Sequence, residues 1–168
     1  MRSFGKRLRA LGSASLSNQN IDPTTSEHQK VVDLAHKLES DPLAADADEN
    51  RRWLMDWVER TADVDIPICP DLLRPLEKTK KMHGQEIYNQ MIFSSAAYII
   101  SNPTKSQNNL AICRAGLEGS LRAYQAILYG RPDSRWKFMD DLVARQTQGT
   151  LDEYIRRTLG KMITLPGD

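Results

Sequence analysis

Apolar residues recur at intervals of three and four along most of the chain, the spacing that lines one face of an α-helix. In the first part of the chain this pattern predicts two helices, one over residues 24–40 and one over residues 45–61. Thr24 and Glu27 have the spacing of a capping box, so we expect the first helix to open at Thr24.

The pattern changes to strict alternation at Val64, Ile66 and Ile68. Such alternation is typical of an extended segment with one apolar side. Proline lacks the N–H group that a central strand needs, so Pro67 and Pro70 argue against a sheet. We therefore predict a connector that lies across the helices, followed by a short helix from Pro70.

The helical period returns over residues 85–101 and again from about 106 to 129. A short proline-containing loop joins these two long helices, so they should pack antiparallel. The second helix contains Gly116 and Gly119, and each interior glycine costs a helix about 1 kcal/mol relative to alanine. Small residues at positions 94–97 would match them, and we interpret the glycines as permitting a close approach of the two backbones.

Two shorter helices, over residues 134–148 and 150–162, complete the pattern, and no strand-rich segment or internal repeat is visible. The sequence predicts one all-α domain over residues 24–165. We expect a single helical bundle of about six helices around a central antiparallel helix pair. Residues 1–23 have little periodic apolar pattern and are predicted to form a disordered basic arm.

Charge divides unevenly along the 168 residues, whose net formal charge is +1. Residues 1–20 carry four basic and no acidic side chains, which leaves −3 for the remainder. Affinity for a nucleic-acid duplex comes largely from basic side chains that neutralise its phosphates. Because the remainder of the chain is negatively charged, we predict no nucleic-acid partner. The basic arm leaves a contact of residues 1–20 with a membrane surface as an alternative to a solvated tail. No apolar run approaches 18 residues, so no transmembrane segment is expected.

The chain has two cysteines, Cys69 and Cys113, and neither a C-x-x-C motif nor a Cys/His cluster. We therefore expect no metal site. In a reducing cytoplasm both cysteines would be buried thiols, whereas in an exported protein they would form one disulfide. The chain as written lacks a convincing signal-peptide core, which favours the cytoplasm, and a start codon elsewhere would permit export.

No nucleophile elbow, phosphate loop, zinc-protease or dinucleotide motif occurs, so we predict no catalytic residues and no cofactor. Glu118 has Arg114 four residues before it and Arg122 four residues after it. We favour an exposed ladder of ion pairs over a buried acid with a perturbed pKa. The alternative is a pocket between the central helices that binds a small ligand or catalyses a reaction through Glu118, Arg122, Tyr124 and Tyr88.

Two stretches combine distinctive features. One is a Trp-rich helix that leads into an extended Val/Ile segment with a cysteine, "LESDPLAADADENRRWLMDWVERTADVDIPICPDLL", and the other is a glycine-containing helix, "AGLEGSLRAYQAIL". In this combination the chain resembles a family of small, uncharacterised bacterial all-helical proteins over about residues 30–160. The family has no assigned activity, so the resemblance implies no catalytic role. Its members often begin with an export signal, and this chain departs from that pattern.

Abundant apolar patterning without a convergent polar site indicates a non-enzymatic protein-interaction or structural module. We expect a protein partner or self-association.

Overall fold

The computed structural model describes residues 22–77 and 83–160. The predicted arm, apart from its last two residues, and the end of the predicted domain after residue 160 lie outside this part of the chain. The described residues form seven α-helices and three short 3-10 helices, without a strand, which confirms the predicted all-α bundle. The α-helices are α1 (Pro23–Ser40), α2 (Ala47–Arg60), α3 (Arg74–Glu77), α4 (Gly84–Ser101), α5 (Asn109–Gly130), α6 (Lys137–Gln148) and α7 (Leu151–Leu159). The 3-10 helices are η1 (Pro70–Leu73), η2 (Pro103–Lys105) and η3 (Pro132–Ser134).

The start of α1 differs from the predicted capping box. Asp22 is the N-cap residue, and its Oδ1 accepts a hydrogen bond from the backbone N–H of Thr24 at 2.9 Å. Pro23 occupies the first helical position, where its missing N–H group costs no hydrogen bond. Because an aspartate caps a helix at least as well as a threonine does, α1 begins one residue before the predicted position.

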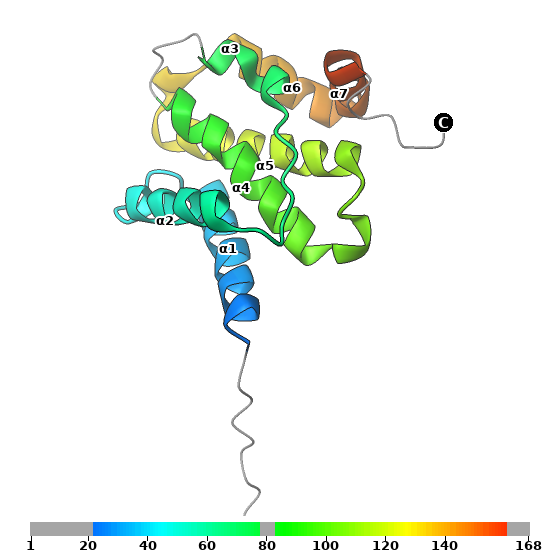
Figure 1. Ribbon diagram of the computed structural model, residues 1–168. Helices are drawn as coiled ribbons and strands as arrows, with labels where there is room; N and C mark the ends of the chain where they lie inside the picture. The colour runs from blue at the N-terminus through cyan, green and yellow to red at the C-terminus, as the bar shows by residue number, and fades with distance from the viewer. Residues whose placement is uncertain (1–21, 78–82, 161–168) are drawn as a thin grey trace, which may run out of the picture.

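The helices α4 and α5 form the centre of the molecule (Figure 1). The turn at η2 reverses the chain between them, so that α5 returns along α4. α1 packs against both, and α2 packs on α1, whereas α3, α6 and α7 lie at the opposite side of the central pair. The central antiparallel pair that the sequence predicts is therefore α4 and α5.

The two interior glycines of α5 allow α4 to approach closely. A Cβ atom added at Gly116 would lie 2.7 Å from the backbone oxygen of Met91, and closer still to the Oγ of Ser95. A Cβ atom at Gly119 would likewise collide with Ser94. Real Cβ atoms essentially never come this close to other atoms. The glycines thus lower the helix propensity of α5 and make possible its contact with the small residues of α4.

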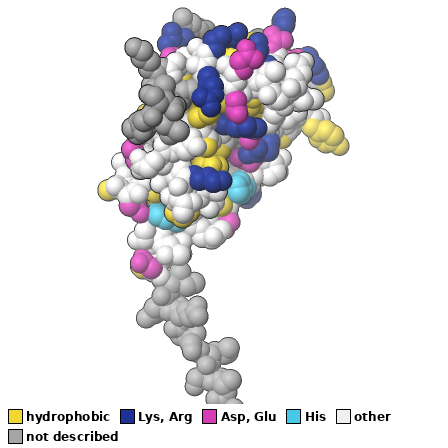
Figure 2. Space-filling model, turned by 90° about the vertical axis from the view of Figure 1, so that its right-hand side faces the viewer, with side chains coloured by type: hydrophobic (Ala, Val, Ile, Leu, Met, Phe, Trp, Pro, Cys, Tyr) yellow, Lys and Arg dark blue, Asp and Glu magenta, His cyan; other side chains and the backbone are white. Residues whose placement is uncertain are grey.

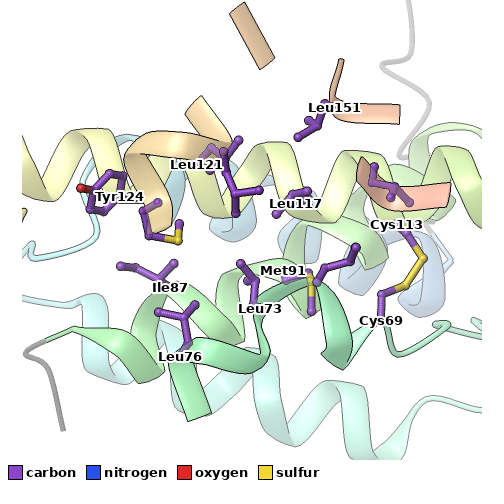
Figure 3. Packing of buried hydrophobic residues seen from close by; sticks show 14 of the residues in the cluster. Cys69, Leu73, Leu76, Ile87, Met91, Cys113, Leu117, Leu121, Tyr124 and Leu151 are labelled. Carbon is purple, nitrogen blue, oxygen red and sulfur yellow. A yellow bond between two sulfur atoms is a disulfide. The ribbon is translucent and has the colours of Figure 1, made fainter. Parts of the chain in front are cut away.

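The central pair separates two clusters of buried apolar side chains, and α4 contributes to both. On one side, residues of α1, α2 and α4 pack around Leu54 and Trp57, which are at most 2% exposed. On the other side, η1, α3 and α5–α7 pack around Leu117 and Leu121 (Figure 3). Ile87 and Met91 of α4 belong to this second cluster. Burial on two sides explains why the apolar arc of α4 is wide.

The connector between α2 and η1, residues 61–69, is extended and runs across the central helices, as predicted (Figure 1). Its predicted apolar side is wrong in one place. Val64 is buried, whereas Ile68 is 59% exposed and Cys69 beside it is 1% exposed. Consecutive residues of an extended chain point to opposite sides, so the burial of Cys69 against α5 turns Ile68 to solvent.

Candidate functional site

A cleft lies where the first turns of α1 meet the end of α2 and the start of the connector. It has a volume of about 330 Å³, and eight residues line it: Thr24, Glu27, His28, Trp57, Arg60, Thr61, Ala62 and Asp63. A second hollow of about 200 Å³ continues from it toward α4 and η2 and is lined in part by Val64, Ile99 and Ser106. His28 and Asp63 line both hollows, so the two hollows adjoin at this pair.

The side chains of His28 and Asp63 contact each other and two neighbouring side chains. The Nε2 atom of His28 lies 3.1 Å from Oδ2 of Asp63. The ring of Trp57 meets the imidazole edge to face, with 5.9 Å between the ring centroids. Thr61 donates a hydrogen bond of 2.8 Å from its Oγ1 to Oδ1 of Asp63. This hydrogen bond is the main reason that the pKa of Asp63 lies below its usual value, with smaller contributions from the backbone and His28. Asp63 therefore stays a carboxylate at neutral pH.

The cleft belongs to the acidic part of the molecule. Residues 22–69, which form α1, α2 and the connector, contain 12 acidic and 5 basic side chains, a net formal charge of −7, whereas residues 83–160 contain 7 acidic and 9 basic side chains, a net charge of +2. On the face shown in Figure 2, Lys and Arg side chains extend from the upper end, where Figure 1 places α6 and α7, to the middle of the face, and Asp and Glu side chains lie among them. Glu27 in the cleft and Glu59 on α2 are both exposed. Negative charge is thus concentrated on α1, α2 and the connector.

The predicted ladder around Glu118 forms on one side only. Arg114 Nε lies 2.9 Å from Glu118 Oε1, and its Nη1 lies 3.0 Å from Asp152 Oδ2 of α7. These contacts, of which the hydrogen bond to Glu118 is the largest, raise the pKa of Arg114. Arg122 instead donates hydrogen bonds to Glu39 of α1. The Glu118 side chain is 25% exposed, so it lies at the surface of α5, and Arg114 links this helix to Asp152 of α7.

The partner of Arg122 is the most buried carboxylate among the described residues that pair with a base. Glu39 is 7% exposed, and its two carboxylate oxygens accept hydrogen bonds of 2.8 and 3.0 Å from the Arg122 guanidinium. Ser94 of α4 donates a further hydrogen bond of 2.6 Å to Oε1 of Glu39. Gln90 donates to Ser94 Oγ at 2.9 Å and to the backbone oxygen of Ala35 at 3.0 Å. This buried polar network ties α1, α4 and α5 together at one point.

Sequence reasoning missed Glu39, although a signal for it exists. A Cβ atom at Gly119 would lie 2.6 Å from Oε1 of Glu39, so the glycine leaves the space that the carboxylate occupies. Glycine in a helix interior indicates that something approaches closely, but the sequence does not say which residue it is. Glu39 and Arg122 are 83 residues apart in the sequence, which places this pairing beyond any local pattern.

The two tyrosines proposed as ligand contacts lie with the core. Tyr124 is 1% exposed, and its hydroxyl donates to Asp140 Oδ1 at 2.9 Å and accepts from the Trp136 N–H at 2.8 Å. Burial is the main reason that its pKa is raised. Tyr88 is half-buried and packs against the same apolar cluster. Arg122, by contrast, pairs with α1, so the structure does not bring the four candidate residues to one place.

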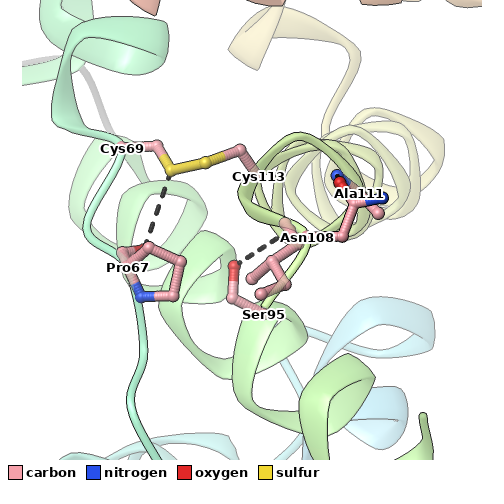
Figure 4. Close-up of a disulfide and its surroundings, with 7 residues drawn as sticks. Pro67, Cys69, Ser95, Asn108, Ala111 and Cys113 are labelled. Atoms are coloured by element: carbon pink, nitrogen blue, oxygen red, sulfur yellow. Dashed lines mark hydrogen bonds between the residues drawn. A yellow bond between two sulfur atoms is a disulfide. The ribbon is translucent and has the colours of Figure 1, made fainter. Parts of the chain in front are cut away.

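Cys69 and Cys113 are joined in a disulfide (Figure 4). Their Cα atoms are 6.1 Å apart, within the usual range for such bonds, and both residues are 1% exposed. Residues 22–77 and 83–160 contain no group of three or more His, Cys, Asp or Glu side chains that could hold a metal ion. Within the same residues, no helix combines the length and the apolar character needed to cross a membrane.

Comparisons of this chain with protein-family models, with curated proteins and with solved structures found no match. The family resemblance over residues 30–160 therefore stays a prediction.

Proposed function

We propose that this protein is a non-enzymatic interaction module that binds a basic segment of a polypeptide partner on α1, α2 and the connector. The observation that carries the proposal is the separation of charge, −7 over residues 22–69 against +2 over residues 83–160. Charge of one sign, concentrated on one side of a protein, attracts a partner of the opposite sign and orients its approach.

The His28–Asp63 cleft is the shaped part of this surface. Exposed carboxylates at its rim, such as Glu27, would meet Lys or Arg side chains, and the two adjoining hollows offer room for them. Asp63 is held as a carboxylate by Thr61, so its charge does not depend on the partner. Lys30 lies over the Trp53 ring with 4.0 Å between Nζ and the centroid, and this contact engages one of the five basic side chains of α1, α2 and the connector.

The alternative of a ligand pocket between the central helices has less support. At Gly116 and Gly119 the contact between α4 and α5 leaves no room even for a methyl group. The side chains proposed for such a pocket are engaged with α1, α6 or α7 or belong to the apolar core.

Two sources can supply the basic segment: another protein, or a second copy of this chain, whose residues 1–20 carry four basic side chains and no acidic one. Native mass spectrometry of the protein from its own cells distinguishes them. A mass of two chains identifies the second copy, and any other protein mass identifies a different partner. A complex of either kind supports the proposal only if it dissociates at raised salt.

Binding is then tested with the full chain and a labelled peptide of residues 1–20, followed by fluorescence anisotropy at low and at physiological salt. Replacing Glu27 and Glu59 by glutamine should weaken binding about fivefold, because two exposed ion pairs contribute about 1 kcal/mol together. The matched control replaces Asp133 and Glu153, two exposed acids of the basic part, by their amides and should leave the affinity unchanged. Equal losses in both variants, or binding that ignores salt, would contradict the proposed surface.

A further inference from the structure

The disulfide connects two parts of the chain that are 44 residues apart, and these are the only two cysteines that the sequence contains. Cys69 ends the connector and is the N-cap residue of η1, whereas Cys113 lies on α5. Figure 4 shows the bond bridging the connector and α5. The disulfide sulfur of Cys69 lies 3.7 Å from the backbone oxygen of Pro67.

We propose that Cys69 and Cys113 are an oxidation site of this protein, joined by a disulfide-exchange enzyme in an oxidising compartment. Disulfides persist in such compartments and are rare where glutathione and thioredoxin keep thiols reduced. This inference is independent of the proposed partner, because it rests on the burial and position of the two cysteines alone.

The reaction is a thiol–disulfide exchange. The thiolate of one cysteine attacks the disulfide of the oxidant and forms a mixed disulfide, which releases one thiol of the oxidant. The thiolate of the other cysteine then attacks the mixed disulfide, which forms the Cys69–Cys113 bond and releases the second thiol. The chain loses two protons and two electrons, and the oxidant gains them as a dithiol.

The burial of the two cysteines determines whether oxidation comes before or after the docking of η1 on α5. Each cysteine is 1% exposed, and Leu73, Leu117 and Met91 belong to the same apolar cluster as the two cysteines (Figure 3). Exchange requires the attacking sulfur to reach the oxidant's disulfide, which this packing prevents. The oxidation must therefore take place before η1 docks on α5 and the cluster closes.

The bond also explains how the connector is held. No backbone–backbone hydrogen bond within the described chain involves residues 62–68. The burial of Val64 fixes this segment at its start, and the disulfide fixes it at its end. Asp63, which forms one wall of the cleft, belongs to the segment that these two contacts position.

The first test is the state of the cysteines in the protein as its own cells make it. Cells are quenched with acid, and the full chain is denatured and treated with N-ethylmaleimide before its intact mass is measured. We expect no maleimide adduct and a mass about 2 Da below that of the fully reduced chain, because two hydrogens are lost. Two adducts per chain would overturn the proposal.

The second test concerns the order of events. Reduced protein is offered oxidised glutathione either at the moment of dilution from denaturant or after it has folded. We expect the disulfide to form at least tenfold faster in the first case, since the thiols are then accessible. The Cys69→Ala variant reports the rate at which Cys113 alone forms a mixed disulfide with glutathione. This rate should likewise be higher during dilution from denaturant than after folding. Equal rates before and after folding would overturn the inferred order.

Discussion

Glu39 of α1 and Arg122 of α5 form a bidentate ion pair in the space that Gly119 leaves free on α5. Ser94 of α4 completes the carboxylate's hydrogen bonds, so three helices meet at this point. The Glu39 hydrogen bonds raise the pKa of Arg122, which therefore stays charged. The pair positions α1, the helix that also presents His28 at the cleft.

Replacing Gly119 by alanine should destabilise the protein. The added methyl group would collide with Ser94 and Glu39, at a cost of about 1–3 kcal/mol for overpacking that exceeds the gain of about 1 kcal/mol in helix propensity. Urea unfolding measures the difference. The control is Gly130→Ala at the end of the same helix, where no atom lies within 4 Å of the added Cβ. A destabilised G130A variant would show that the effect is not one of packing.

The coupling between Glu39 and Arg122 can be measured with a double-mutant cycle of E39Q, R122M and the double variant. Removing one partner leaves the other charge without its counter-ion. The losses of unfolding free energy in the two single variants should therefore add up to more than the loss in the double variant. Because Arg122 is half exposed to solvent, we expect a coupling of about 1–2 kcal/mol, below that of a fully buried pair. Additive effects in urea unfolding would mean that the pair does not stabilise the fold.

Loss of the disulfide should lower stability strongly. The bond closes a segment of 44 residues, for which the chain-entropy relation gives about 4 kcal/mol. Wild-type protein in its oxidised form and the Cys69→Ala, Cys113→Ala double variant are compared by chemical unfolding without reductant. If the reduced wild type were as stable as the oxidised form, the bond would not hold the fold together.

The hydrogen bond from Thr61 to Asp63 should make stability depend on pH. Because the folded-state pKa of Asp63 lies below its usual value of 3.8, the unfolded chain binds its proton first as the pH falls. The stabilisation is therefore complete above the unfolded pKa and is lost as the pH falls through the folded pKa. In the Thr61→Val variant the pKa of Asp63 should rise, as followed by carboxyl carbon NMR. The stability difference between this variant and wild type should shrink in the same acidic range; a constant difference would exclude this linkage.

Tyr124→Phe tests the buried hydroxyl at α6. The change removes an acceptor of the Trp136 N–H and a donor to Asp140, and we expect a loss of about 1–2 kcal/mol. Burial raises the pKa of Tyr124, so its stabilisation is present below the ordinary pKa of 10 and is lost as the pH rises through the folded value. Above neutral pH, the free energy of unfolding should therefore fall less steeply with rising pH for the variant than for the wild type.

The sequence by itself determined the helices of this protein and their central pair. The spacing of apolar residues is a local property, so it predicts α4 and α5, and the glycines of α5 indicate their close contact before any neighbour is known. The position of Asp22 as the helix cap shows that even local signals compete, since aspartate and threonine both cap well.

Only the tertiary structure decided which side chains meet. Glu39 with Arg122, His28 with Asp63 and Cys69 with Cys113 are brought together by the way the helices cross, which no local spacing contains. The exposure of Ile68 has the same cause, because the attachment of its neighbour to α5 determines which way it points. Helix periodicity arises within a few residues of the chain, whereas polar and covalent partners are selected by contacts between distant segments in the packed molecule.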